Sequence, residues 1–162
     1  MRTSIVFVIG LLLGAAISTN SAPEGATLAG MDGVNHVGIY VGNVDEAKAF
    51  FTDKMGFRDA FTVRDDKGQP TLAYVQASAD TFIELQPSGA NRPAGISHVG
   101  LRVQDIRATI ATLKQRGVTV EDARASSTKS MIANVTGPEG VRIELSELPP
   151  ESLQRKAMNS WK

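Results

Sequence analysis

The sequence predicts an α+β protein built from two repeated β-α-β-β-β modules. Two stretches carry this prediction: residues 34–44 read VNHVGIYVGNV and residues 96–106 read ISHVGLRVQDI. Aligning them places His36 on His98, at an offset of 62 residues. Internal repetition of this kind indicates one structural unit used twice. We therefore interpret the chain as two copies of one module.

A second, shorter repeat places one carboxylate in each module. Glu84 and Glu144 each lie between isoleucine and leucine, at an offset of 60 residues. The chain contains only two histidines, His36 and His98, and both occupy the same place in the longer repeat. Each module thus supplies one imidazole and one carboxylate, and we expect the four groups to share one centre.

Composition limits the class of protein. A chain of 162 residues forms one compact domain or two small modules with a shared core. With 42% apolar and 21% charged residues it has the composition of a globular protein. The formal net charge is zero and no long basic run occurs, so no nucleic-acid partner is expected. The lack of cysteine excludes disulfides, thiolate metal ligands and a cysteine nucleophile.

The first residues resemble a secretory signal. Arg2 precedes the apolar run Ile5–Ile17, which is short for the ~30 Å hydrocarbon layer but suits the apolar region of a signal peptide. We expect a signal peptide over residues 1–22, a secreted or periplasmic protein, and no membrane span once the leader is removed. An uncleaved anchor is the alternative, because Pro23 would follow the cut directly. Residues 23–33, rich in Gly and Ala, predict a flexible lead-in.

The helix and strands of the first module are predicted from the spacing of apolar residues and from the residues that cap or end each element. Alternation of apolar residues over Val34–Val41 predicts a strand. Asn43 or Asp45 can cap a following helix, which Gly56 ends. The further strands of this module, which spans residues 34–86, are expected at Phe57–Arg64, Leu72–Ala77 and Thr81–Gln86.

The second module, residues 96–147, repeats this order after a Pro- and Gly-rich linker. Asp105 can cap its helix, which Gly117 ends. Its expected strands are Ser97–Val103, Val118–Ala123, Met131–Val135 and Val141–Ser146. In the tail, residues 148–162, apolar side chains recur at helical spacing after two prolines, which predicts a short docking helix.

The residue types indicate a metal site. Gly38 and Gly100 follow each histidine by two positions, which leaves open space on the histidine face of each strand. Two imidazole nitrogens and two carboxylate oxygens suit Zn, Ni, Co, Mn or Fe(II). Two carboxylates buried together without a cation would be costly. A single strand histidine is more often an ordinary core residue, so the prediction depends on all four groups obeying one repeat.

These features resemble the vicinal oxygen chelate proteins, the group of glyoxalase I, methylmalonyl-CoA epimerase, extradiol dioxygenases and antibiotic-resistance proteins. The resemblance covers residues 34–147 and rests on the two histidine strands, the capped helices after them and the Gly-Val-Arg-Ile-Glu-Leu ending at residues 140–145. It implies that the two modules form a cupped half-barrel pair around a metal site. In glyoxalase-I-like members the four ligand positions correspond here to His36, Glu84, His98 and Glu144.

The resemblance also implies an activity. It points to a divalent-metal-dependent lyase, isomerase or epimerase that acts on a small molecule with adjacent oxygens. The ion would stabilise an enediolate, while Glu144, and also Glu84, would shuttle a proton. Members of the group often form homodimers. An extradiol-type dioxygenase using His36, His98 and Glu144 is one alternative, and a non-catalytic small-molecule binding or resistance protein is another.

Substrate contacts are less well defined. Tyr40 stands where glyoxalase I has an arginine that helps to hold glutathione. It is predicted to lie on the same face of its strand as His36, which makes it a candidate for substrate binding. Arg102 holds the equivalent place in the second copy, where it could bind a substrate carboxylate or form a surface salt bridge. Lys129 and Ser130 are further candidates at a strand entrance.

Overall fold

A computed structural model describes residues 28–162. The expected signal peptide and residues 23–27 of the expected lead-in lie outside these residues. Within the described part, no helix has the length and apolar character needed to cross a bilayer.

Eight strands form a single sheet in the order β2-β3-β4-β1-β5-β8-β7-β6. The strands of the first module are β1 (Met31–Val41), β2 (Arg58–Arg64), β3 (Pro70–Gln76) and β4 (Phe82–Pro87). Those of the second are β5 (Gly95–Val103), β6 (Arg124–Ala125), β7 (Met131–Thr136) and β8 (Arg142–Glu147). The strands of each module thus stay together in one half of the sheet.

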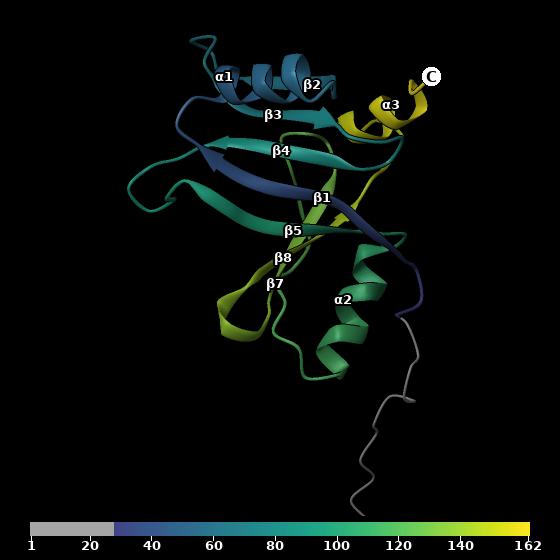
Figure 1. Cartoon of the computed structure of the whole chain (residues 1–162). Coiled ribbons are helices and arrows are strands. Elements are labelled where there is room, and N and C mark those ends of the chain that lie inside the picture. Colours follow the sequence, from purple (N-terminus) through teal and green to yellow (C-terminus); the bar gives the residue numbers. More distant parts are fainter. Residues whose placement is uncertain (1–27) are drawn as a thin grey trace, which may run out of the picture.

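The two halves repeat one topology. β1 runs parallel to β4 and β5 runs parallel to β8, while the antiparallel pair β1–β5 joins the modules at the centre. The sheet is strongly curled, so that β8 and β7 cross behind β1 and β5 in Figure 1. The predicted α+β fold with a half-barrel made from two β-α-β-β-β modules is confirmed.

The helices begin where the capping residues predict. Asn43 caps α1 (Val44–Ala49), which continues as a π-helical turn over Phe50–Lys54. Asp105 caps α2 (Ile106–Gln115), accepting a hydrogen bond from the Ala108 amide at 2.9 Å. In the tail, Ser152 caps α3 (Leu153–Asn159).

Apolar side chains pack between the sheet and the helices α1 and α2. Leu85 on β4 packs with Val44 of α1, and Leu145 on β8 packs with Ile106 of α2. Because successive side chains on a strand point to opposite faces, the residue before each leucine points away from these helices. That residue is a glutamate in both cases.

One predicted strand is wrong in its placement. Residues 118–123 form no continuous ladder, and β6 begins only at Arg124. Val120 makes an isolated bridge to Val135, and Val118, Val120 and Ala123 pack against the core under α2. Packing of three apolar side chains on one core thus outweighs strand pairing at this outer edge of the sheet.

Candidate metal centre

The four residues of the repeat meet on one face of the curled sheet. They lie on the adjacent strands β4, β1, β5 and β8, and all are at least nine-tenths buried. Nε2 of His36 is 3.0 Å from Nε2 of His98, 3.6 Å from Oε2 of Glu84 and 3.5 Å from Oε1 of Glu144. Nε2 of His98 is 3.1 Å from Oε2 of Glu84. One chain therefore brings all four groups together.

Strand register explains the convergence. Gly38 pairs with Glu84 on one side and with His98 on the other, while Gly100 pairs with His36 and with Glu144. A Cβ at Gly38 would overlap the His98 ring, and a Cβ at Gly100 would overlap the His36 ring. Each imidazole therefore lies in the space that the glycine of the other module leaves open.

Each of the four side chains has a polar partner from its own strand. Asn35 Oδ1 lies 3.4 Å from His36 Nδ1, and Ser97 Oγ lies 2.6 Å from His98 Nδ1. The carboxylate oxygens accept from Gln86 Nε2 on Glu84 (2.8 Å) and from Ser146 Oγ on Glu144 (3.2 Å).

These partners obey the same repeat. Asn35 and Ser97 differ by 62 positions, and Gln86 and Ser146 differ by 60, so the repeat offsets could have identified them. A donor or acceptor on the far nitrogen of an imidazole sets its tautomer and ring orientation, as partners of metal-bound histidines do. The Asn35 side chain is itself held, because its Nδ2 donates to the Asp80 carbonyl at 2.7 Å.

The surroundings shift the pKa values of His36, Glu84 and Glu144 in different directions. Burial lowers the pKa of His36 to about 4, which leaves a neutral imidazole with a free lone pair. Burial acts to raise the pKa of Glu84, but the imidazoles of His98 and His36 outweigh it and the pKa is lowered. Burial, together with the charge of Glu84, raises the pKa of Glu144.

The donor set fits a divalent ion. Two ligand atoms about 2.1 Å from one ion are about 3.0 Å apart at a right angle and about 3.4 Å apart at a tetrahedral angle. The three separations among Nε2 of His36, Nε2 of His98 and Oε2 of Glu84, from 3.0 to 3.6 Å, match this spacing. Oε1 of Glu144 lies 3.5 Å from Nε2 of His36 but is not part of this group of three mutually close ligand atoms. Ligand atoms of His36, Glu84 and His98 all lie within 4.8 Å of one another. Oε2 of Glu84 is buried and accepts no well-aligned hydrogen bond among the described residues, although both Nε2 atoms lie close to it, so a cation between these atoms would satisfy it.

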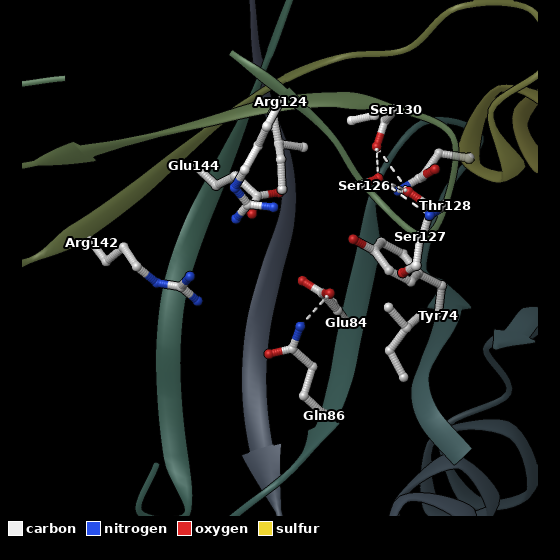
Figure 2. A pocket seen from close by; sticks show the side chains of 14 residues that line it. Tyr74, Glu84, Gln86, Arg124, Ser126, Ser127, Thr128, Ser130, Arg142 and Glu144 are labelled. Atoms are coloured by element: carbon white, nitrogen blue, oxygen red, sulfur yellow. Dashed lines mark hydrogen bonds between the residues drawn. The ribbon is translucent and has the colours of Figure 1, made fainter. Parts of the chain in front are cut away.

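A cavity of about 220 Å³ lies beside this centre (Figure 2). Glu84 and Glu144 form part of its wall, and Tyr74, whose pKa burial and the two glutamates raise well above 10, adds a protonated hydroxyl. The other lining residues are mostly polar: Leu72, Gln86, Arg124, Ala125, Ser126, Ser127, Thr128, Ser130, Ile132, Arg142 and Gln154.

Three hydroxyls form the wall opposite the centre. Ser126, Thr128 and Ser130 lie within 2.8 Å of one another, and Gln154 of α3 donates to Thr128 at 3.0 Å. The tail helix therefore contributes to the cavity, which periodicity alone did not reveal. Ser130 lines the cavity as expected, whereas Lys129 is not among the lining residues.

Two predicted substrate contacts lie elsewhere. Arg102 pairs with Asp32, with Nε 3.0 Å from Oδ2, and is not among the residues that line the cavity. Arg92 lies over the ring of Tyr40, with its Cζ atom 5.7 Å from the ring centroid, and Tyr40 is not among the residues that line the cavity either. The structure therefore brings the four predicted ligands together but not these two side chains.

Comparison with known proteins decides the family. The model of the Glyoxalase/Bleomycin resistance protein/Dioxygenase superfamily matches residues 33–145, which include both modules. The chain belongs to this superfamily. The match agrees with the resemblance that the two repeats indicated.

The curated relatives of this protein include two probable lactoylglutathione lyases. The one from Synechocystis sp. is 30% identical over 119 residues, which cover 68% of this chain and 91% of the relative. The one from Vibrio parahaemolyticus is also 30% identical over 119 residues, covering 68% and 86%.

Solved structures of epimerases are similar in fold. Methylmalonyl-CoA epimerase from Mycobacterium tuberculosis has a TM-score of 0.64 at 25% identity and covers 79% of this chain and 95% of its own. A variant of the Streptomyces coelicolor epimerase in complex with 2-nitronate-propionyl-CoA has a TM-score of 0.62 at 21% identity, covering 75% and 98%. At this identity the second likeness concerns the fold alone.

Proposed function

We propose that this protein is a divalent-metal-dependent lyase or isomerase of the glyoxalase-like type, which moves a proton next to a carbonyl group of a small substrate. The observation that carries the proposal is the meeting of His36, His98 and Glu84 beside a polar cavity, with their ligand atoms 3.0–3.6 Å apart and Glu144 3.5 Å from His36. This set of groups suits a catalytic ion that keeps positions open for substrate oxygens.

His36, Glu84, His98 and Glu144 would hold the ion, which is Zn, Ni, Co, Mn or Fe in this proposal. A bound ion supplies positive charge that polarises a substrate carbonyl and stabilises the enediolate charge that develops when the neighbouring carbon loses a proton. Asn35 and Ser97 would keep the Nε2 atoms of the two histidines directed at the centre.

Glu144 is our candidate for the proton shuttle. In the metal-free protein, burial and the charge of Glu84 raise the pKa of Glu144, whereas the imidazoles of His98 and His36 lower that of Glu84, so the two carboxyls have different environments. Glu144 also lines the cavity, where a substrate carbon would lie. In this scheme the carboxylate takes a proton from the carbon beside the carbonyl and returns it to the adjacent carbon.

The experiment is incubation of the metal-loaded protein in heavy water with two substrate families. The names of the relatives suggest 2-oxo thiol adducts and acyl-CoA esters as candidates. We expect deuterium to enter the carbon beside the carbonyl. Glu144→Gln should slow this exchange about 100-fold or more, because it removes the general base.

Glu139→Gln is the matched control, since Glu139 is an exposed glutamate just before the same strand. It should exchange at the wild-type rate. Oxygen uptake with catechols would instead support a dioxygenase, and substrate binding without exchange would support a non-catalytic binding protein. Equal exchange by wild type and Glu144→Gln would contradict the role given to Glu144.

A further inference from the structure

Arg142 extends into the cavity from β8, beside the proposed metal centre (Figure 2). It precedes Glu144 by two positions, and residues two apart on a strand share a face. The side chain is half-buried, and no carboxylate oxygen among residues 28–162 lies within 4.0 Å of its nitrogens. Its positive charge is thus partly withdrawn from water without a paired anion, an arrangement that is unfavourable unless a ligand supplies the counter-charge.

The present partners of Arg142 are a hydroxyl and an imidazole. Its Nη2 donates to Ser97 Oγ at 2.9 Å and also contacts Nδ1 of His98. A planar guanidinium has five donors, so these contacts leave most of its hydrogen-bonding capacity unused.

Metal binding by His98 would release one of these contacts. A neutral imidazole that binds an ion through Nε2 carries its proton on Nδ1, which then donates and cannot accept. Ser97 Oγ, 2.6 Å away, can accept that proton. Arg142 can then no longer donate to His98, so its guanidinium needs another acceptor, and the cavity that it lines is the adjacent space.

A second guanidinium lines the same cavity. Arg124 on β6 is exposed and forms no ion pair within 4.0 Å in the described part of the chain. Together with the hydroxyls of Ser126, Thr128 and Ser130, the wall of the cavity offers two positive charges and several donors to a ligand. Carboxylates and phosphates are the groups that guanidinium binds best, through paired hydrogen bonds.

We propose that Arg142, assisted by Arg124, binds an anionic group of the substrate, so that the substrate carries a carboxylate or phosphate close to its pair of adjacent oxygens. This inference rests on the proposed function, because it places the adjacent oxygens at the metal centre. Arg142 thereby selects among small molecules that the metal centre alone would bind alike.

The test uses three hydroxamates and the Co(II)-loaded protein. Acetohydroxamate is uncharged outside its metal-binding oxygens, malonohydroxamate adds a carboxylate, and phosphonoacetohydroxamate adds a phosphonate. Binding is followed by the visible absorption of the Co(II) ion, which does not depend on turnover. We expect at least one charged probe to bind about tenfold or more tightly than acetohydroxamate, as charge-assisted hydrogen bonds allow, and the preferred probe identifies the anion.

Arg142→Gln should remove this preference and leave the dissociation constant for acetohydroxamate within about twofold, since that probe has no anionic group for Arg142 to bind. Arg142→Lys, which keeps the charge, should retain part of the preference, and circular dichroism checks that both variants fold. Arg107→Gln, an exposed arginine on α2, is the matched control and should bind all three probes like the wild type.

The outcomes separate this inference from the proposed function. If cobalt binds and acetohydroxamate changes its spectrum, but neither charged probe is preferred or Arg142→Gln keeps the preference, only the role of Arg142 is overturned. If the wild type takes up no cobalt, the metal centre is overturned and the role of Arg142 with it.

Discussion

Gly38 and Gly100 leave the space into which the two imidazoles extend. In each case the nearest atoms to an added Cβ belong to the histidine ring of the other module. The ring is fully buried and packed against Tyr74 in the case of His36, so it has little room to move aside. The glycines are therefore as much a part of the centre as the ligands.

We predict that Gly100→Ala weakens divalent-metal binding by at least about tenfold and lowers the free energy of unfolding by about 1–3 kcal/mol, because the new methyl displaces the His36 ring. Isothermal titration with Zn²⁺ and urea unfolding measure the two effects. Gly42→Ala is the control, since nothing lies within 4 Å of its Cβ position. Wild-type affinity in Gly100→Ala would contradict this role of the glycine.

The repeat predicted the four ligand candidates, and it contained the signal for their partners Asn35, Ser97, Gln86 and Ser146. It could not predict the contact of Arg102. Asp32 reaches that guanidinium because β1 begins at Met31, in residues that composition marked as a flexible lead-in. Nor could it single out Arg142, because the lack of a carboxylate partner is a property of the folded structure.

Helix caps and strand register hold the centre from outside. Asp105 begins α2, whose Ile106 packs on Leu145 next to Glu144, and the Ile106 amide donates to Glu147 of β8 at 2.9 Å. The cap and the ligand strand are thus coupled through the core. The caps were predictable from local sequence, whereas the displaced edge strand β6 was not, because core packing at long range decided it.

Replacing Asp105 by alanine should lower the free energy of unfolding by about 1 kcal/mol, since the Ala108 amide loses its acceptor. Metal affinity should stay within about twofold, because an N-cap sets helix stability and leaves the ligand atoms in place. Asp66→Ala, in an exposed turn, should change neither quantity. A large loss of metal affinity in Asp105→Ala would show that α2 positions the ligands directly.

The whole molecule is one curled sheet in which the antiparallel pair β1–β5 joins the two modules. The topology of the sheet follows from the repeat, and its curl brings buried ionisable groups from both modules to the junction. The stability of the metal-free chain should therefore depend on their protonation.

In the metal-free protein, burial lowers the pKa of His36 from 6.5 to about 4. The unfolded chain binds this proton at higher pH than the folded chain, so the stability from neutral His36 is complete above pH 6.5 and is lost as the pH falls toward 4. We expect urea unfolding of chelator-treated protein to show up to about 1.4 kcal/mol lost per pH unit from this group. His36→Gln should reduce the dependence of the unfolding free energy on pH between 6.5 and 4 by that amount. An unchanged slope in His36→Gln would contradict this contribution of His36.

The most direct test of the metal centre is elemental analysis of the purified protein after dialysis against Zn²⁺, Ni²⁺ or Co²⁺ and removal of free ions. The centre described here predicts about one divalent ion per wild-type chain, about one in Asp66→Ala, and little or none in His98→Ala, which removes one of the two imidazoles. Equal metal content in wild type and His98→Ala would contradict a site shared by the two modules.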